Sequence, residues 1–307
     1  MNKLFGALLL VPMLSFSQQN EILEYFKSKD SLVGVKDQHG KIIVPAQFKI
    51  FSYLEDGELV KGETIYFDGY REDDEEKNAS GYVYDRKGNF LYRPFAYDNG
   101  ADYFSEGLRR FVKNGKVGFV DRNGKVIIEA KHDFVSSFHY GYAAYCDGCD
   151  WEKTEDEHKA IVGGTWGVMN FKGQTVNPVE MSWNTVPVNG KNYPYPFSYN
   201  QKEKTILQFF EKQNKKLSEL YYVNHYTKLS DDEKKLFFEL VERPKENFPF
   251  YQVNAYDYRK VEAGLSGLKF LVSEDGSKVF ALEYDDEKIP FETWLKEQRK
   301  QAEEFQK

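Results

Sequence analysis

The chain has 307 residues and is acidic, with 49 acidic and 42 basic side chains and a formal net charge of −7. Nucleic acids and anionic membranes are bound through basic faces, so this balance argues against both as partners. Aromatic residues make up 17% of the chain. Tyrosine suits half-buried β-strands, and an aromatic recognition face is the alternative explanation.

The first 17 residues have the layout of a secretory signal peptide. Its parts are the positive charge of Lys3, the apolar run Leu4–Phe16, and the small residues Ser15 and Ser17 before a predicted cut at Gln18. A buried N-terminal helix is the alternative, which Pro12 disfavours because proline interrupts helices. We therefore expect a periplasmic or secreted chain that does not insert into a membrane after cleavage, with residues 18–30 as an N-terminal segment.

A turn motif then recurs four times. Each copy has Asp or Asn, two further residues and Gly, and the copies are Asp37–Gly40, Asp85–Gly88, Asp121–Gly124 and Asn170–Gly173. The Asp or Asn side chain accepts hydrogen bonds from N–H groups inside the turn, and glycine takes a positive φ without steric cost. Because β-type residues flank every copy, the motif predicts antiparallel hairpins, each closed by a type I turn and a left-handed glycine.

The flanking residues define the expected strands. The first strands are residues 32–36, 81–84, 117–120 and 166–169, and the second strands are residues 41–44, 89–92, 125–128 and 174–177. Pro45, Pro94 and Pro178 follow three of the second strands. Proline has no N–H to donate, so we expect these prolines to end the pairing.

A second glycine follows three of the turns, at Gly57, Gly107 and Gly141. The segments around the last two run Phe104–Leu108 and Phe138–Tyr142, and a third strand should follow each glycine. One unit is therefore about three short strands and two glycine turns. A fixed internal period of this kind indicates a repeat architecture.

Three segments, Trp166–Val168, Val117–Asp121 and Phe104–Leu108, resemble the WG repeat of bacterial exported proteins. The resemblance covers about residues 31–180, although only Trp166 keeps the tryptophan. It implies a β-rich tandem array, which we place at residues 31–185, and an interaction role. It does not imply a reaction.

Two connections, near residues 62–78 and 146–163, are longer than the period requires, and both are acidic. Their acids are Glu72, Asp73, Asp74, Glu75 and Glu76 in the first, and Glu152, Glu155, Asp156 and Glu157 in the second. In repeat proteins such insertions often lie on the binding face. The alternative is a pair of solvated loops that keep an aromatic-rich array soluble.

Residues 186–199 contain several prolines and are predicted to be a linker. Beyond them the apolar pattern becomes helical, with one face formed by residues 206, 209, 210, 217, 220 and 221. Ser230–Glu233 has the form of a capping box, which predicts a helix to about Val241. Asp275-Gly276 predicts a hairpin, and Pro290 the start of a last helix.

The predicted fold class is thus mainly β, with tandem antiparallel WG-type hairpin repeats followed by a smaller, helix-rich α+β region at residues 200–307. No transmembrane stretch is expected after the signal peptide.

Cys146 and Cys149 are the only cysteines. In an exported protein the pair predicts a disulfide. A redox-active dithiol is the alternative, and the neighbouring carboxylates disfavour it because they raise thiol pKa values. A zinc site with two of His132, His139 and His158 would need preset geometry, and the second Cys-x-x-Cys that would support it is absent.

No nucleophile elbow, metalloprotease or phosphate-loop motif occurs. We therefore expect a non-catalytic binding or scaffold protein for an envelope protein or glycan, without a cofactor or metal. The alternative is an envelope enzyme, either a thiol–disulfide oxidoreductase at Cys146 and Cys149 or a hydrolase with scattered carboxylates. A third possibility is a helper module whose C-terminal helices dock a partner.

Overall fold

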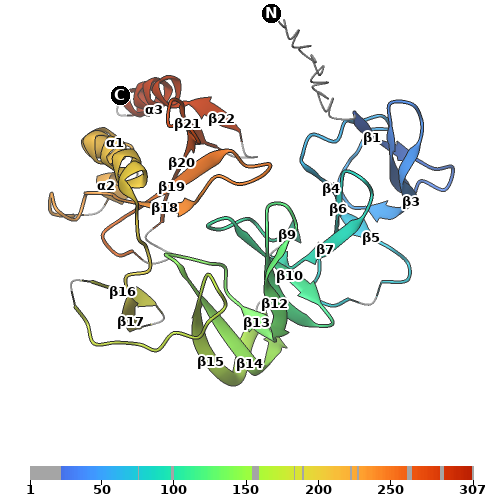
Figure 1. The fold of residues 1–307 in the computed structure, drawn as a ribbon, viewed down its shortest axis with the longest axis horizontal. Coiled ribbons are helices and arrows are strands. Elements are labelled where there is room, and N and C mark those ends of the chain that lie inside the picture. Colours follow the sequence, from blue (N-terminus) through green and yellow to red (C-terminus); the bar gives the residue numbers. More distant parts are fainter. Residues whose placement is uncertain are drawn as a thin grey trace, which may run out of the picture.

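A computed structural model describes residues 22–74, 76–97, 100–153, 159–182, 184–188, 190–221, 223–226, 228–260, 265–283 and 287–305. The predicted signal peptide and its cut at Gln18 lie outside these ranges, as do Glu75, His158 and residues 155–157. The described chain forms an arch (Figure 1). The N-terminal strands make one limb, the middle strands the base, and the C-terminal sheet with its helices the other limb.

The fold is mainly antiparallel β-sheet, as predicted. The first sheet has the order β1-β2-β3-β5 and consists of β1 (Leu23–Lys27), β2 (Val33–Asp37), β3 (Ile42–Ile50) and β5 (Gly69–Tyr70). The second has the order β12-β11-β10-β7-β6-β4 and consists of β4 (Thr64–Phe67), β6 (Tyr82–Asp85), β7 (Phe90–Pro94), β10 (Leu108–Lys113), β11 (Lys116–Asp121) and β12 (Val126–His132). The short strands β8 (Ala96–Tyr97) and β9 (Gly100–Ala101) pair with each other.

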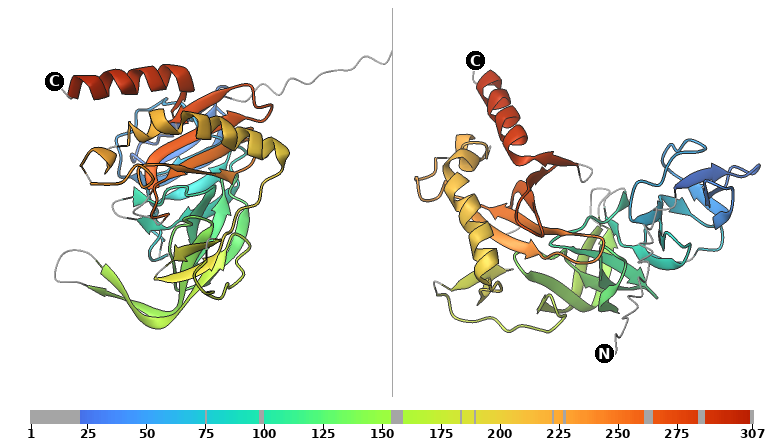
Figure 2. Two further views of the ribbon diagram at one scale, coloured as in Figure 1. Left: turned by 90° about the vertical axis from the view of Figure 1, so that its left-hand side faces the viewer. Right: turned by 45° about the horizontal axis from the view of Figure 1, so that its top comes forward.

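The base of the arch carries a long hairpin. Strand β13 (Phe134–Val135) pairs with β14 (Tyr142–Lys153), which pairs with β15 (Lys159–Asn170). Figure 2 shows this hairpin curling away from the body. Its outer part corresponds to the predicted acidic insertion at residues 146–163. The prediction of a loop is wrong for the described residues, because the pairing continues to Lys153 and Lys159.

The predicted insertion at residues 62–78 is also ordered by pairing. It contains β4 and β5, and two of its acids, Asp74 and Glu76, bind neighbouring parts of the array. Asp74 forms an ion pair with Arg93 at 2.6 Å, and Glu76 accepts from the backbone N–H groups of Asn114 and Gly115. These two carboxylates therefore hold the sheet together and do not form a solvated loop or a free binding face.

Two predicted strand ends are wrong. Strand β3 continues through Pro45 to Ile50, whereas residues 174–177 form only an isolated bridge from Thr175 to Met169. Proline is tolerated in β3 because residues 45–47 bulge opposite the single residue Gly34, where no ladder N–H is needed. Residues 129–131 bulge in the same way opposite Gly118 in the third unit.

Residues 186–199 are not a linker. The hairpin of β16 (Thr185–Val188) and β17 (Lys191–Pro194) lies there, and Val186 and Tyr193 are buried. They pack with Tyr142 of the array and Tyr256 of the C-terminal sheet in one apolar cluster. The apolar side chains between the prolines thus join the two regions.

The described residues of the C-terminal region form one sheet and three helices. Strands that are consecutive in the chain are neighbours in this sheet, in the order β18 (Phe237–Glu242), β19 (Phe250–Tyr256), β20 (Leu265–Ser273), β21 (Val279–Leu282) and β22 (Lys288–Pro290). The helices are α1 (Gln201–Ser218), α2 (Val223–Tyr226) and α3 (Phe291–Phe305). Phe210 of α1 and Trp294 of α3 pack on Phe270 of the sheet. No helix in the described part of the chain is long and apolar enough to cross a membrane.

The predicted helix from Ser230 to about Val241 is wrong. Ser230 and Glu233 exchange the hydrogen bonds of a capping box, but the chain forms one turn and then becomes strand β18. Phe237–Glu242 pairs with β19, and Phe238 and Leu240 enter the core beneath the helices while Val241 packs in the cluster on the other face. Tertiary pairing therefore overrides the local helix signal.

Candidate functional site

The four repeat turns share one set of hydrogen bonds. In the first, Oδ1 of Asp37 accepts from the N–H groups of His39 and Lys41, both at 2.9 Å. Asp85, Asp121 and Asn170 accept from the residues two and four positions later, at 2.8–3.2 Å. The glycines of these turns have φ values of +83° at Gly40, +86° at Gly88, +76° at Gly124 and +69° at Gly173.

Successive turns lie against each other. A Cβ added to Gly88 would meet the carbonyl oxygen of Ile43 at 2.2 Å, and one added to Gly124 would meet the side chain of Leu91 at 2.6 Å. Gly173 faces Ile128 at 3.0 Å in the same way. Each contacted residue follows the preceding turn glycine by three or four positions, so each turn is seated beside the one before it. We call this row of turns the turn edge.

The second glycines have φ values of +88° at Gly57, +81° at Gly107 and +79° at Gly141. At Gly107 and Gly141 the residue before the glycine, Glu106 or Tyr140, also has a positive φ. This combination gives two-residue hairpins of type I′. For residues other than glycine this conformation costs about 1–2 kcal/mol, so other contacts must hold it.

Glu106 provides such contacts because it bridges to the next unit. Its carboxylate accepts from the N–H groups of Tyr140 at 2.6 Å and Gly141 at 2.9 Å. It also accepts from the hydroxyl of Tyr256 in β19, at 2.6 Å. Burial raises the pKa of Glu106, and the three hydrogen bonds partly oppose this shift because they favour the charged form.

Glu106 and Tyr140 of the array meet Tyr256 and Glu239 of the C-terminal sheet, and we call this contact the seam. Glu239 of β18 is its second buried carboxylate. It accepts from the hydroxyls of Tyr140, Tyr195 at 2.6 Å and Tyr199 at 2.5 Å. Burial raises the pKa of Glu239, and the three hydroxyl donors lower it again in part. Tyr140 stands in the third unit where Glu106 stands in the second, and its partner is the C-terminal sheet.

An ion-pair cluster lies beside these carboxylates. Glu242 of β18 binds Arg122 at 3.0 Å and Lys245 at 2.8 Å. Its carboxyl carbon lies 2.6 Å from the position that a Cβ added to Gly107 would take. The Arg122 guanidinium carbon is 4.7 Å from the ring centroid of Phe248 in the C-terminal region. The third turn is thus fastened to the C-terminal sheet by charge and by cation–π contact.

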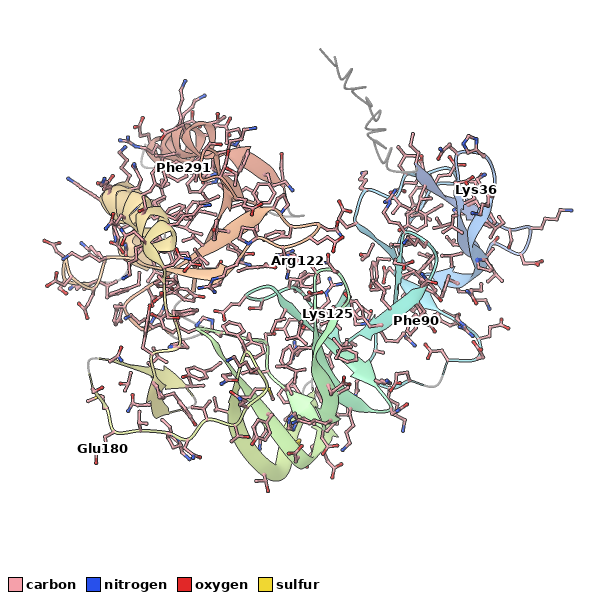
Figure 3. The ribbon with its side chains drawn as sticks, viewed as in Figure 1. Lys36, Phe90, Arg122, Lys125, Glu180 and Phe291 are labelled. Carbon is pink, nitrogen blue, oxygen red and sulfur yellow. A yellow bond between two sulfur atoms is a disulfide. The ribbon has the colours of Figure 1, made fainter. Side chains whose placement is uncertain are left out.

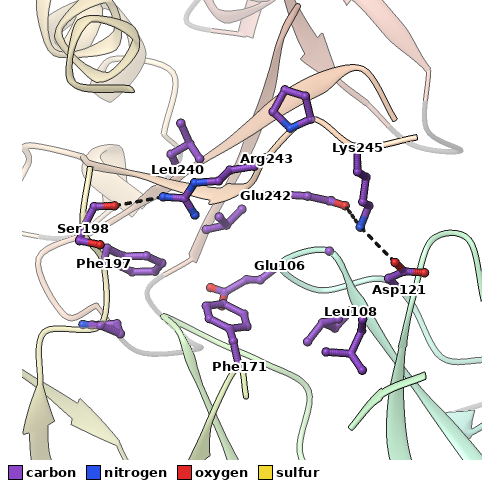
Figure 4. Close-up of a pocket in the computed structure, with 15 residues that line it drawn as sticks. Glu106, Leu108, Asp121, Phe171, Phe197, Ser198, Leu240, Glu242, Arg243 and Lys245 are labelled. Atoms are coloured by element: carbon purple, nitrogen blue, oxygen red, sulfur yellow. Dashed lines mark hydrogen bonds and ion pairs between the residues drawn. The ribbon is translucent and has the colours of Figure 1, made fainter. Parts of the chain in front are cut away.

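A pocket of about 470 Å³ opens at this seam (Figure 4). Its apolar lining includes Ile127 of β12 and Phe171 of the fourth turn, and its charged lining includes Arg243 and Lys245. Arg243 is paired with Glu203 at 2.7 Å. The charged groups of the pocket therefore already have counterions within the chain.

Cys146 and Cys149 are joined in a disulfide on β14. Of the candidate zinc ligands, His132 binds Asp147 at 2.8 Å and stacks on Tyr145, and the ring of His139 packs against Tyr256. Within the described residues no three His, Cys, Asp or Glu side chains are grouped as a metal site. Of the seven glycines predicted from the sequence, Gly107 and Gly141 lie at the seam, beside Glu242 and Glu106. Gly40, Gly88, Gly124 and Gly173 close the four repeat turns, and the N–H of Gly57 donates to the carbonyl of Tyr25.

The repeat pattern does not predict the acids and tyrosines of the seam. Two signals were available. Tyr140 replaces Glu106 at one repeat position, and Glu239 and Glu242 interrupt an otherwise apolar run in residues 236–242. Acidic residues are seldom fully buried unless they are paired, so such an interruption indicates a buried contact.

A comparison with protein families matches the WG-containing repeat at residues 118–148. The match begins at Gly118, includes the third turn and Gly141, and ends within β14. No curated protein and no solved structure matches the chain. The structure of the third unit and the family match lead to the same conclusion, that residues 118–148 of this chain are a WG-containing repeat.

Proposed function

We propose that residues 31–185 form a tandem array of WG-type hairpin units and that this array is a non-catalytic binding or scaffold module. The shared hydrogen bonds of the four turns and the seating of each turn beside the one before support the tandem arrangement. Repeat arrays need a terminal element that covers their last interface, and the C-terminal sheet supplies it through Glu239 and Tyr256.

One observation carries the non-catalytic part of the proposal. The buried carboxylates of the seam, Glu106, Glu239 and Glu242, are all engaged by donors or cations of the chain itself. A general acid or base must reach a proton of its substrate, and carboxylates held in this way serve packing. Cys146 is fully buried in a strand, so its sulfur is not exposed to a substrate disulfide.

Export belongs to the same proposal and rests on the sequence of residues 1–17. The partner would then be a protein or glycan of the cell envelope. The test is to immobilise the full mature chain, pass envelope extracts and a panel of purified glycans over it, and identify what is specifically retained. A reproducible partner that is released by free protein supports the binding role. Absence of any retained partner under all conditions contradicts it.

The enzyme alternative has its own assay. Reduction of insulin by the wild-type chain, lost in Cys146→Ser, would support an oxidoreductase. A flat assay for both proteins removes that alternative and leaves the binding role in place.

A further inference from the structure

The turn edge carries a row of exposed lysines. Each of the four turns has one lysine immediately before or after its glycine, and these are Lys41, Lys87, Lys125 and Lys172. Within the described ranges none of the four forms an ion pair with the chain, whereas Lys245 at the nearby seam is paired with Glu242. The Asp or Asn side chains of the turns point inward to their own N–H groups. Asp37 and Asp121 are only 6% and 7% exposed, so the lysines are the exposed charges of these turns on a chain whose net charge is −7.

Exposed apolar side chains accompany the lysines. The second residue after the turn glycine is Ile42, Phe90 or Val126 in the first three units, and these side chains are 49%, 53% and 38% exposed. In the fourth unit the position holds Thr175. Single exposed apolar residues are ordinary, but the same position repeated in consecutive units forms a continuing feature of one surface.

The spacing of the row follows from the seating of the turns. Each turn glycine lies beside a residue three or four positions beyond the preceding turn glycine. Three residues of strand span about 10 Å, so neighbouring turns are separated by about that distance. In Figure 3, Phe90 of the second unit lies toward the N-terminal limb and Lys125 of the third lies toward the centre of the arch. The row thus runs along the array and not around a single hairpin.

We propose that the turn edge binds an extended acidic peptide segment of a partner protein. This inference rests on the proposed binding function and names its partner class. An extended or polyproline-type chain advances about 3.1–3.3 Å per residue, so a carboxylate at every third residue would repeat at about 10 Å and meet successive lysines. Apolar side chains between the carboxylates would contact Ile42, Phe90 and Val126.

A peptide fits this edge better than an acidic glycan. Sugar rings stack on flat aromatic faces, and two of the three apolar positions, Ile42 and Val126, are branched aliphatic side chains. Those side chains suit the aliphatic side chains of a peptide. The lysines and the apolar positions together therefore require a ligand that alternates charge with aliphatic surface.

The test uses the full mature chain and a fluorescein-labelled synthetic peptide of about 15 residues with Glu at every third position and Leu and Ala between. Anisotropy measured at low salt should show saturable binding that weakens as salt is added. Reversing the row, with Lys41→Glu, Lys87→Glu, Lys125→Glu and Lys172→Glu together, should weaken binding by about tenfold or more, because each exposed ion pair contributes modestly and there are four. A matched control reverses four exposed lysines elsewhere, namely Lys29, Lys61, Lys204 and Lys212, and should bind within about twofold of wild type.

A second variant addresses the apolar positions. Ile42→Ser with Val126→Ser leaves the net charge unchanged and should weaken binding of the Leu-containing peptide more than that of an otherwise identical Ser-containing peptide. Circular dichroism of each variant shows whether it is folded. If the row variant does not fold, single reversals at Lys41 and Lys87 give the same comparison.

Three results would overturn the inference. They are equal binding by the row variant and the control variant, absence of binding by the acidic peptide, and preference for polygalacturonate over the peptide. The proposed binding function is tested separately by the retention experiment, because it predicts a retained envelope partner even if that partner does not bind the turn edge. A partner retained equally by wild type and row variant would keep the function and reject this site.

Discussion

Replacing Gly118 by Ala tests how the bulge in each unit is accommodated. A Cβ at this position would lie 2.4 Å from the carbonyl oxygen of Ile128, 2.6 Å from the nitrogen of Ala130 and 2.7 Å from the carbonyl carbon of Glu129. All three atoms belong to the backbone of the bulge, so no flexible side chain can move aside. The bulge itself must shift.

Overpacking of this kind costs about 3 kcal/mol when the surroundings cannot relax. For a domain of about 150–250 residues each kcal/mol lowers Tm by roughly 2–4 °C, so Gly118→Ala should lower Tm by about 6–12 °C. The control is Gly100→Ala, where a Cβ would meet nothing within 4 Å. It should leave stability within about 0.5 kcal/mol of wild type.

The measurement is thermal and urea unfolding followed by circular dichroism and tryptophan fluorescence on both variants. Gly34→Ala should behave like Gly118→Ala, because its Cβ would lie 2.6 Å from the carbonyl oxygen of Val44 in the corresponding bulge. If Gly118→Ala is as stable as Gly100→Ala, the close approach of the bulge to this glycine is not what holds the unit together.

Three further outcomes are expected. The folded-state pKa of Glu239 is raised above its unfolded value, so the folded state binds more protons between the two pKa values and loses stability as pH rises through that window. The free energy of unfolding of wild type minus that of Glu239→Gln, from urea titrations, should therefore fall as pH rises from about 4.5 and then level off. A difference that stays constant with pH contradicts this prediction. Glu242→Ala removes the carboxylate that pairs with Arg122 and Lys245, and leaves Lys245 only Asp121 at 4.0 Å. It should cost about 3 kcal/mol, against less than about 0.5 kcal/mol for the exposed Glu246→Ala, and equal urea midpoints would show that the cluster contributes nothing. Alkylation should modify Cys146 and Cys149 only after reduction, and reduction should cost about 2 kcal/mol because the closed loop is short; labelling without reductant would disprove the disulfide.

Much of the local structure was readable from residue order. A turn of Asp-x-x-Gly contains its own hydrogen-bond acceptor and its own left-handed residue, so Asp37–Gly40 and Asp121–Gly124 depend little on distant contacts. The mainly antiparallel β class followed from the strands around such turns. The strand limits failed at Pro45, because the bulge opposite Gly34 depends on which residues face each other across the sheet.

The failures in the second half have a common cause. Ser230 and Glu233 form the hydrogen bonds of a capping box, yet Phe237–Glu242 becomes a strand because β19 offers it a partner and a buried face. Residues 186–199 look like a linker by composition, but Val186 and Tyr193 find an apolar cluster between the array and the C-terminal sheet. Neither partner is adjacent in sequence.

The sequence by itself determined the repeated turns, the glycines that they need and the mainly β class, because each of these depends on a few consecutive residues. The tertiary structure alone decided the seam, where Glu106 and Tyr140 of the array meet Tyr256 and Glu239 of the C-terminal sheet. Those contacts join residues about 100 or more positions apart. A buried carboxylate is tolerated only when hydrogen-bond donors surround it in the folded state, and the local sequence does not indicate where those donors will lie.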